Sequence, residues 1–400
     1  MKLPIYLDYN ATTPIDPEVV EEMLPYLREH FGNPSSGHLY GQQTHAAVER
    51  ARIQTAELLG CDPGEIIFTG GGTEANNHAI RGVAFANRDR GNHLISSQIE
   101  HPAVLNTLRY LEGHGFKVTY LPVDRHGRVN PEDVRRAITA QTILITVMHA
   151  NNEVGSIQPI AEIGGIAREK GVCLHTDAAQ SVGKIPAKVD ELKVDLLTVA
   201  AHKFYGPKGI GALYVRRGTR IESFLQGAGH EQGRRAGTEN VPYIVALGKA
   251  AELAGQRLEA DRQRIFALRE RLFEKLVKSV EGVTLNGHLT ERLPNTLNVS
   301  FAGLEGGALL AKVPEVAAST GSACNDKCRE FSKVLKAMGV PPELGFGSIR
   351  FSLGRWTTGE EIDYAAEVIA SRVKELRGAN EGVSHRHDEV GLTALASCAG

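Results

Sequence analysis

Short runs of β-branched and other apolar residues alternate, over the first two-thirds of the chain, with longer stretches in which apolar residues recur every three or four positions. The short runs predict buried β-strands at residues 66–68, 93–96, 117–121, 142–148, 172–175, 196–199 and 211–215. The longer stretches predict amphipathic helices at residues 45–59, 103–114, 131–138 and 160–170. Strand–helix alternation of this kind predicts an α/β fold with a mostly parallel sheet flanked by helices on both faces.

The pattern changes in the last third of the chain. A segment rich in Arg and Glu at residues 251–278 predicts a long exposed helix that joins two domains. Beyond it, short strands at 296–301 and 347–351 alternate with helices at 328–338 and 359–376, which predicts a smaller α+β domain. We therefore expect a large domain at 14–255, a small domain formed by 1–13 and 256–377, and a polar tail at 378–400.

Composition narrows the range of functions. With 42% hydrophobic residues, the 400-residue chain can bury a large core. Its 45 basic and 47 acidic side chains nearly cancel, so charge offers no argument for binding nucleic acid or an anionic membrane. Five scattered cysteines indicate a reducing compartment, and no set of Cys and His residues has the spacing of a metal site. The sequence shows neither a signal peptide nor an apolar run of membrane-spanning length, so we expect a cytoplasmic protein.

Polar residues cluster directly after five of the predicted strands. The clusters are TGGGTE at 69–74, Glu100 with His101, NNE at 151–153, Asp177 with Gln180, and His202 with Lys203. In an open parallel sheet, ligand-binding groups gather in the loops at the carboxyl ends of the strands. The sequence therefore predicts a ligand site along this edge of the sheet.

Lys203 lies in the segment AAHKFYGPKG at 200–209, directly after a predicted buried strand and before a Gly-Pro turn. Burial lowers the pKa of a lysine, and the neutral amine is the form that condenses with an aldehyde cofactor. A solvated lysine at a strand end is the commoner case when a lysine is seen alone. The polar loops around Lys203 favour the interpretation that it binds a cofactor.

Two further segments suit an aldehyde cofactor that carries a pyridine ring and a phosphate. Asp177 follows an apolar strand, where its carboxylate can pair with a protonated ring nitrogen; an N-cap of a following helix is the alternative. The glycines at 70–72 precede a helical stretch, so the backbone N–H groups there are suited to bind a phosphate. A glycine-rich turn without a ligand is the alternative for that run.

Several motifs occur together: YLDYNATT at 6–13, FGNPSS at 31–36, NNEVG at 151–155, RRAGTEN at 234–240 and SIRFSLGR at 348–355. On these motifs the chain, up to about residue 377, resembles the NifS/IscS-type cysteine desulfurases, a class V aminotransferase-like family of fold-type I enzymes that use pyridoxal 5'-phosphate (PLP). The resemblance implies a sulfurtransferase that converts L-cysteine to L-alanine. It also implies an acceptor protein for the sulfur, or for selenium from L-selenocysteine, and a symmetric homodimer with active sites at the interface.

The resemblance assigns roles to four residues around the cofactor ring. Lys203 resembles the lysine that binds PLP covalently, and His101 resembles the histidine that stacks on the ring and transfers protons. Asp177 matches the partner of the ring nitrogen, and Gln180 matches the donor to the phenolic oxygen. The resemblance thus places the groups that bind and activate PLP in the loops that the strand pattern had already singled out.

Further positions match the groups that bind the phosphate and the substrate. The phosphate-binding positions are Gly72, Thr73, His202 and, reaching the phosphate of the neighbouring subunit, Thr238. The positions that bind the substrate carboxylate are Asn33, Asn152 and Arg350, and Asn152 also matches a residue that contacts the cofactor. A planar guanidinium can bind a carboxylate through two parallel hydrogen bonds.

Cys324 lies in the segment ASTGSACND at 318–326, whose small polar residues predict a mobile, exposed loop. A thiolate on such a loop can reach the cofactor and then an acceptor, and the run GSAC matches the nucleophile of the family. Packing as a small buried hydrophobe is the alternative for a lone cysteine. The resemblance implies that Lys203 removes the α-proton of the substrate, and that Cys324 attacks the substrate sulfur and keeps it as a persulfide.

The chain departs from the family pattern at two places. Ala200 stands where the family usually has a serine, so we expect slightly weaker PLP retention unless Thr198 or a water molecule compensates. The run NDKCRE at 325–330 replaces a run rich in Ser and Gly. Its Cys328, four residues after Cys324, is suited to receive the persulfide sulfur or to form a disulfide, and equally to pack at the start of a helix.

The end of the chain has a different character. Residues 391–400, GLTALASCAG, resemble the opening of selenophosphate synthetases, in which such a stretch leads to a catalytic Cys or selenocysteine. A desulfurase fused to the start of such a synthetase is one interpretation, and a disordered tail is the other. Three alternatives to a cysteine desulfurase also stay open: a selenocysteine lyase-like enzyme, an aminotransferase-type PLP enzyme and a non-catalytic sulfur-assembly scaffold.

Overall fold

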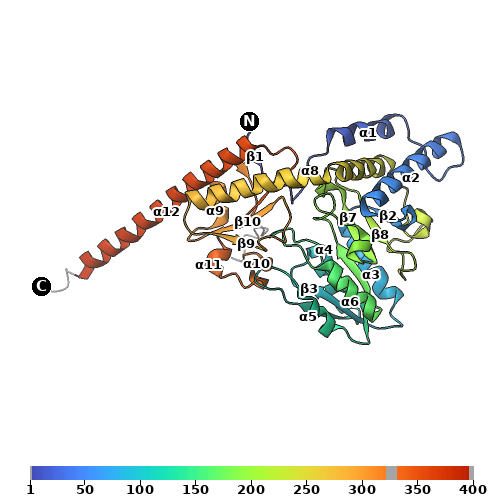
Figure 1. The fold of residues 1–400 in the computed structure, drawn as a ribbon, viewed down its shortest axis with the longest axis horizontal. Helices are drawn as coiled ribbons and strands as arrows, with labels where there is room; N and C mark the ends of the chain where they lie inside the picture. Colours follow the sequence, from blue (N-terminus) through green and yellow to red (C-terminus); the bar gives the residue numbers. More distant parts are fainter. Residues whose placement is uncertain (1, 321–330, 396–400) are drawn as a thin grey trace. The chain divides into compact units, whose positions relative to one another are not determined.

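The computed structural model describes residues 2–320 and 331–395, with side chains as far as residue 378 (Figure 1). The chain forms two compact units. The large unit consists of Tyr9–Gln263 and Gly287–Pro294, and the small unit consists of Met1–Asp8, Arg264–Asn286 and Asn295–Gly400. The predictions for Cys324, Cys328 and residues 396–400 concern positions outside the described residues.

The boundaries between the units differ from those that the sequence pattern predicts. The first falls after Asp8 rather than after residue 13, and the second falls after Gln263 rather than after residue 255. Residues 9–13 belong to the large unit because Thr13 is bonded to the loop after residue 200: Thr13 N donates to His202 O at 3.0 Å, and Tyr205 N donates to Thr13 Oγ1 at 2.9 Å. Helix α8 (Val241–Ser279) contributes residues to both units.

The large unit is built on a seven-stranded sheet with the strand order β2-β8-β7-β6-β5-β3-β4. The strands are β2 (Ile66–Thr69), β3 (His93–Ser97), β4 (Lys117–Leu121), β5 (Thr142–Thr146), β6 (Cys173–Asp177), β7 (Leu196–Ala200) and β8 (Gly211–Val215). All neighbouring strands pair in parallel except β8, which runs antiparallel to both β2 and β7. The predicted α/β fold with a mostly parallel sheet is therefore confirmed, and each of these strands overlaps a predicted run.

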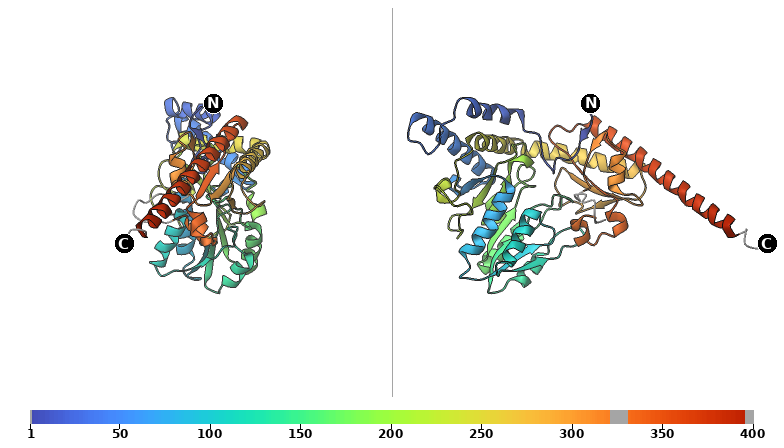
Figure 2. Two further views of the ribbon diagram at one scale, coloured as in Figure 1. Left: turned by 90° about the vertical axis from the view of Figure 1, so that its left-hand side faces the viewer. Right: turned by 180° about the vertical axis from the view of Figure 1, so that it is seen from behind.

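Helices flank the sheet of the large unit (Figure 2). They are α1 (Pro17–Arg28), α2 (Leu39–Leu59), α3 (Gly72–Ala86), α4 (Pro102–Glu112), α5 (Pro131–Ala137), α6 (Ile160–Lys170), α7 (Val189–Leu192) and the first part of α8, with the 3-10 helices η1 (Pro63–Glu65), η2 (Ala201–Lys203) and η3 (Glu231–Gly233). Side-chain caps determine several of the starts: Asp16 accepts from Glu18 N at 3.0 Å before α1, and Asn130 accepts from Glu132 N at 3.0 Å before α5. A proline follows each of these caps, at a position where a helix leaves the N–H unpaired.

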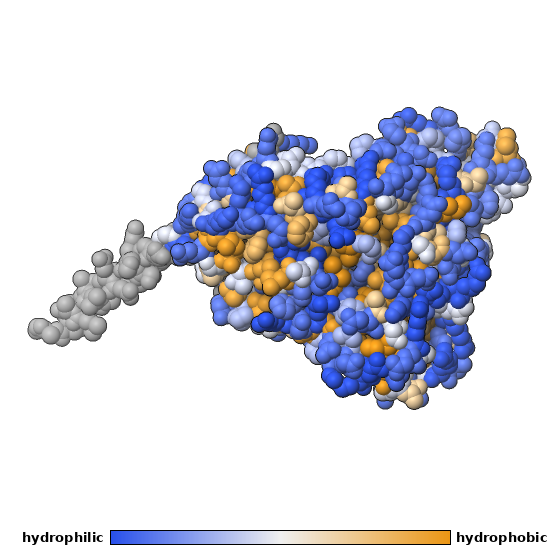
Figure 3. Space-filling model, in the orientation of Figure 1, coloured by the Kyte–Doolittle hydropathy of each residue, from blue (hydrophilic) through white to orange (hydrophobic). Residues whose placement is uncertain are grey.

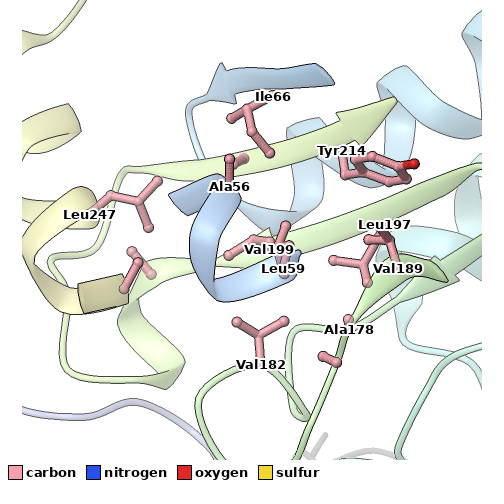
Figure 4. Close-up of a cluster of buried hydrophobic side chains, with 14 of the residues drawn as sticks. Ala56, Leu59, Ile66, Ala178, Val182, Val189, Leu197, Val199, Tyr214 and Leu247 are labelled. Carbon is pink, nitrogen blue, oxygen red and sulfur yellow. The ribbon is translucent and has the colours of Figure 1, made fainter. Parts of the chain in front are cut away.

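Alternate residues of the strands of the large sheet enter two different hydrophobic cores. Ile66 and Phe68 of β2 belong to the core that Figure 4 shows, to which α2 contributes Leu59 and α8 contributes Leu247. Ile67, which lies between them in the sequence, belongs to another core together with residues of α3 and α4. Successive side chains of a strand point to opposite faces of the sheet, so both faces are buried and the register of the strands is strongly specified.

The small unit holds, in its described part, a three-stranded antiparallel sheet with the order β12-β10-β9 and a parallel pair of β1 with β11. Its elements are β1 (Ile5–Tyr6), β9 (Val283–Asn286), β10 (Thr296–Phe301), β11 (Val316–Ala317), β12 (Ser348–Ser352), α9 (Gly306–Ala311), α10 (Lys333–Ala337), α11 (Pro342–Gly345) and α12 (Gly359–Leu395). Alternate residues of β10, such as Leu297 and Val299, share a core with Ile362 and Ile369 of α12.

Helix α12 is longer than the sequence pattern predicts. The periodic pattern ends at residue 376, whereas the helix, drawn in red in Figure 2, continues to Leu395. The segment between these positions contains no proline, so every residue can donate its backbone N–H to the helix. The expected polar tail therefore begins as a continuation of α12.

The surface of the large unit is predominantly hydrophilic on the face that Figure 3 shows. Among the described residues, no helix is both long enough and apolar enough to cross a membrane. The same part of the chain contains no group of three or more His, Cys, Asp and Glu side chains that could hold a metal ion.

A buried ion pair connects α2 to the segment between β8 and α8. Arg52 donates from Nη1 and Nη2 to the two carboxylate oxygens of Glu231 at 2.8 and 2.9 Å, and both side chains are almost fully buried. Glu231 Oε2 also accepts from Phe68 N at 3.0 Å, and Arg52 Nη1 donates to Ile66 O at 2.9 Å. Glu231 and Gln232 have φ of +50° and +59°, a conformation that non-glycine residues seldom adopt, and these bonds hold them in it.

We predict that Arg52→Met lowers the free energy of unfolding by about 3–5 kcal/mol, because the Glu231 carboxylate then stays buried without its charge partner. Urea unfolding measures the change, and the double variant Arg52→Met/Glu231→Gln should recover part of the loss. The exposed pair of Arg135 and Glu169 offers a matched control, because Arg135→Met removes the same kind of partner in solvent and should leave the unfolding midpoint nearly unchanged. Equal losses in the two single variants would contradict the prediction.

Candidate active site

The polar loops that the sequence singles out follow β2, β3, β5, β6 and β7, which run in the same direction. Their carboxyl ends therefore lie along one edge of the sheet. Asp177 is the last residue of β6, and Lys203 lies in η2, immediately after β7. The groups predicted around the cofactor ring thus belong to a single edge of the large unit.

Lys203 is bound by the N-terminal segment of the large unit. Its Nζ donates to the carbonyl oxygens of Asn10 at 2.7 Å and Ala11 at 2.8 Å, and its side chain is half-buried. In neighbouring His202, burial lowers the pKa of the imidazole to about 4, and the charge of Lys203 acts in the same direction, so this histidine is neutral near pH 7. The two carbonyl acceptors and the partial burial favour a cofactor-binding lysine over a solvated strand-end lysine.

The carboxylate of Asp177 is buried and has two hydrogen-bond donors. Asn76 Nδ2 donates to Oδ2 at 2.7 Å, and Ala179 N donates to Oδ1 at 3.0 Å. Asp177 is not a helix N-cap, because turns and coil follow it and the next helix begins only at Val189. Sequence reasoning missed Asn76; the signal available was an amide on the apolar, buried side of α3.

His101 is the N-cap of α4, and its Nδ1 accepts from Ala103 N at 3.1 Å. A neutral imidazole that accepts at Nδ1 carries its proton on Nε2. Desolvation lowers the pKa of His101, the Asp177 carboxylate raises it and the Lys203 ammonium lowers it. His101 therefore lies within electrostatic reach of both of the charged groups predicted to contact the cofactor.

The glycine run forms a turn at the N-terminus of α3. Gly71 has φ of +139°, a conformation that L side chains rarely adopt, and the helix begins at Gly72. Within the described residues no side chain caps this end, so its first N–H groups are suited to bind an anion. A Cβ at Gly72 would lie 3.1 Å from Ala200 Cβ and 3.8 Å from Thr198 Cγ2, so the turn packs closely against the end of β7.

Thr198 presents its methyl group, and not its hydroxyl, to this turn. Its Oγ1 is bonded to His175 Nε2 at 3.0 Å, and His175 Nδ1 is bonded to Thr146 Oγ1 at 2.8 Å, which makes a buried polar row across three strands. Burial lowers the pKa of His175 to about 3, so the ring is neutral and donates one of these bonds while it accepts the other. The hydroxyl of Thr198 therefore does not replace the serine hydroxyl that is missing at position 200.

Gln180 is buried and belongs to a chain of hydrogen bonds that reaches Lys203. Gln180 Nε2 donates to Asn10 O at 2.9 Å, the same carbonyl that accepts from Lys203. Lys184 Nζ donates to Gln180 Oε1 at 2.7 Å and to Asn10 Oδ1 at 3.1 Å. Sequence reasoning missed both Asn10 and Lys184, because their contacts join segments about 170 residues apart.

The remaining predicted site residues belong to several different segments. Asn152 O accepts from Asn10 Nδ2 at 3.2 Å, near the groups described above, whereas Asn33 lies on an exposed loop with its Oδ1 accepting from Ser35 N at 3.0 Å. Thr73 follows Gly72 in α3, and Thr238 is exposed between η3 and α8. Arg350, on β12 of the small unit, donates from Nη2 to Asp8 Oδ1 at 2.6 Å. Cys324 lies outside the described residues, and the roles of all these residues stay predictions.

Glu100 is a buried acid beside the predicted cofactor residues. Ser97 Oγ donates to its Oε1 at 2.5 Å and Met148 N donates to the same oxygen at 3.0 Å, while Oε2 has no hydrogen-bond partner among the described residues. Burial raises the pKa of Glu100 to about 8, against the effect of those two bonds and in the same direction as the charge of Asp177. The carboxyl group is therefore largely neutral near pH 7.

A model of the class-V aminotransferase family matches residues 5–365 of the chain. The chain is 51% identical to the cysteine desulfurase IscS of Dictyoglomus turgidum, over 94% of this chain and 96% of that protein. It is 50% identical to a cysteine desulfurase of Homo sapiens, over 94% of this chain and 82% of that protein.

Solved structures show the same fold. A NifS-like protein superposes with a TM-score of 0.88 at 38% identity, covering 93% of this chain and all of the other. The structure of SspA in complex with cysteine superposes with a TM-score of 0.79, also at 38% identity, covering 88% of this chain and all of the other.

We predict that Glu100→Gln changes how the stability of the protein depends on pH. The folded protein raises the pKa of Glu100 from 4.5 to about 8, so the wild type loses stability as the pH rises between these values, because the unfolded chain releases a proton that the folded protein retains. Glutamine stays neutral, so the urea midpoint of the variant should rise relative to that of the wild type between about pH 5 and about pH 8.5. Exposed Glu191→Gln is the control and should show a difference independent of pH. The same pH-independent result for Glu100→Gln would contradict the assignment.

Proposed function

The chain belongs to the class-V aminotransferase family, as a PLP-dependent cysteine desulfurase, and we propose that it transfers the sulfur of L-cysteine first to Cys324 and then to an acceptor protein. The observation that carries the proposal for the site is the set of contacts around Lys203. A half-buried amine, a buried carboxylate held by two donors and an uncapped helix N-terminus belong to one edge of the sheet.

The residues at this edge suit PLP. Lys203 would bind its aldehyde carbon, Asp177 would pair with the ring nitrogen, and Gln180 would donate to the phenolic oxygen. The N-terminus of α3, with Gly72, Thr73 and His202, supplies donors for the phosphate, and Asn152 would contact the cofactor from the loop after β5. When bound, PLP supplies an electron sink for the pair of electrons left by removal of a proton from the substrate α-carbon.

Lys203 and His101 are the two residues that would transfer protons to and from the substrate. Lys203 would act as the base for the α-proton in its neutral form, and its two carbonyl contacts show that Nζ reaches the sheet edge. Neutral His101 is suited to donate the proton on Nε2, because its Nδ1 is occupied by the backbone of α4. Desolvation lowers the pKa of the His101 imidazole and so favours its neutral form, and the Lys203 ammonium acts in the same direction while Lys203 is protonated.

Sulfur leaves the substrate through Cys324. The thiolate of Cys324 attacks the substrate sulfur, a sulfur–sulfur bond forms as the carbon–sulfur bond breaks, and the carbon fragment takes up one proton at the β-carbon and regains one at the α-carbon to become alanine. Asn33, Asn152 and Arg350 would bind the substrate carboxylate. The ion pair with Asp8 supports this role for Arg350, because it restricts the orientation of the guanidinium. Selenocysteine offers the same chemistry, with selenium in place of sulfur.

We propose that the enzyme is a homodimer of the cytoplasm in which Thr238 of each subunit reaches the phosphate of the other. Thr238 is exposed in the large unit, which leaves it accessible to a second copy. The exposed rings of Phe31 and Tyr40 stack at 5.6 Å between centroids, and Leu39 between them in sequence is 66% exposed. Exposed aromatic groups of this kind are typical of protein interfaces.

Cys61 and Cys173 are unbridged, as expected in a reducing compartment.

We predict that Lys203→Ala abolishes the visible absorption band of the PLP-loaded enzyme, and that Cys324→Ala keeps the band but loses turnover of L-cysteine by at least about a thousandfold. Alanine and sulfide release measure turnover. Cys61→Ala is the matched control: burial raises the pKa of that thiol to about 12, so it holds little reactive thiolate and its removal should spare activity. Full turnover of L-cysteine by Cys324→Ala would rule out the persulfide route. Alanine release from L-selenocysteine by the same variant distinguishes a selenocysteine lyase.

We predict that Ala200→Ser strengthens PLP binding by about fivefold to tenfold, because the new hydroxyl stands at the end of β7 opposite the first turn of α3 and adds a donor for the phosphate. Equilibrium dialysis of PLP against the apoenzyme measures the dissociation constant. Ala140→Ser, at an exposed position, serves as the control and should leave the constant unchanged. If Ala200→Ser binds PLP no more tightly than the wild type, the expected weakness of this phosphate site is wrong.

A further inference from the structure

Lys184 binds two side-chain oxygens beside the predicted cofactor residues. It lies between β6 and α7, is half-buried, and donates from Nζ to Gln180 Oε1 at 2.7 Å and to Asn10 Oδ1 at 3.1 Å. A lysine ammonium donates hydrogen bonds and accepts none. Lys184 can therefore face only the oxygen end of each of these two amides.

This contact determines how the two amides are turned. Since the oxygen of Gln180 faces Lys184, its NH₂ group is the end that donates to Asn10 O at 2.9 Å. Since the oxygen of Asn10 also faces Lys184, its NH₂ group is the end that donates to Asn152 O at 3.2 Å. One N–H of the Gln180 amide donates to Asn10 O. The direction of the second N–H is fixed as well, because both hydrogens belong to the same planar NH₂ group.

We propose that Lys184 is a positioning residue of the cofactor site: it acts through Gln180, whose amide it turns so that an N–H, and not the carbonyl oxygen, faces the phenolic oxygen of bound PLP. This inference rests on the proposed binding of PLP by Lys203. A bond from an ammonium to the amide oxygen also polarises the amide, which strengthens the hydrogen bond that its N–H donates.

Several other charged and titratable groups lie within electrostatic reach of Lys203. His101 interacts with both Asp177 and Lys203, and His202 interacts with Lys203, Lys208, Lys184 and His101. Lys208 therefore adds a positive charge to the same surroundings. It is exposed, and no hydrogen bond joins it to Gln180 or Asn10 within the described residues. Lys208 thus provides a matched control for Lys184, because it separates an effect of charge alone from an effect of hydrogen bonding to Gln180.

The test measures the pH midpoint of the visible absorption change of the PLP-loaded enzyme. A donor to the phenolic oxygen and a nearby positive charge both favour the deprotonated form of the chromophore, so their loss raises its pKa. Lys184→Met should raise the midpoint by roughly half a unit to one unit, and should weaken PLP binding by about threefold to tenfold. Lys184→Arg keeps the charge and the donors and should stay close to the wild type, whereas Lys208→Met should shift the midpoint far less than Lys184→Met.

A double variant tests whether Lys184 acts through Gln180. In a Gln180→Ala background the amide is gone, so adding Lys184→Met should leave the midpoint where Gln180→Ala alone puts it. If Lys184→Met does not yield folded protein, Lys184→Ala, which also removes both the charge and the donor, replaces it in both backgrounds with the same expected direction.

Each outcome supports or overturns the proposed role of Lys184. An unchanged midpoint in the Lys184 variant overturns the proposal. An equal shift in Lys208→Met, or a Lys184 effect that persists without Gln180, also overturns it, in favour of a general effect of charge. If the wild type itself shows no visible band after loading with PLP, the proposed function fails instead, and the two failures are thereby distinguished.

Discussion

Lysine side chains donate hydrogen bonds and accept none, and this constraint organises the polar edge of the large sheet. Lys203 requires acceptors and finds them in the carbonyl oxygens of Asn10 and Ala11, while Lys184 takes the side-chain oxygens of Asn10 and Gln180. Asn10 thus serves both cations, one through its backbone and one through its side chain. The N-terminal segment must therefore pack against the loop after β7 before the edge can assume this arrangement.

Around these cations, burial keeps other titratable groups neutral. It lowers the pKa of His149 and His202 to about 4 and that of His175 to about 3, and it raises the pKa of Glu100 to about 8. Near pH 7 the electrostatic field at this edge of the sheet consequently comes from a few charged groups, chiefly Lys203, Lys184 and the Asp177 carboxylate. Such a field suits a ligand that carries negative charge on its phosphate and phenolic oxygens and positive charge on its ring nitrogen.

The sequence predicted those features whose cause is local. Apolar runs of strand length predict β2 to β8 because both faces of the sheet are buried, and the order of strands and helices predicts a parallel sheet whose carboxyl ends share an edge. Lys203, Asp177 and His101 stand out for the same reason, since each lies at or within a few residues of the carboxyl end of a strand. The motifs then identified the family, and the comparisons with known proteins bear that identification out.

What the sequence determined by itself was therefore the layout: which segments form the sheet, which loops carry chemistry and which family the chain belongs to. Only the tertiary structure decided the partners of those groups. Asn76 on Asp177, Lys184 on Gln180 and the hydroxyl of Thr198 turned toward His175 all depend on contacts between segments far apart in the chain. The geometry of a hydrogen bond is set by where two elements pack, and periodicity along one segment carries no information about the distance to another.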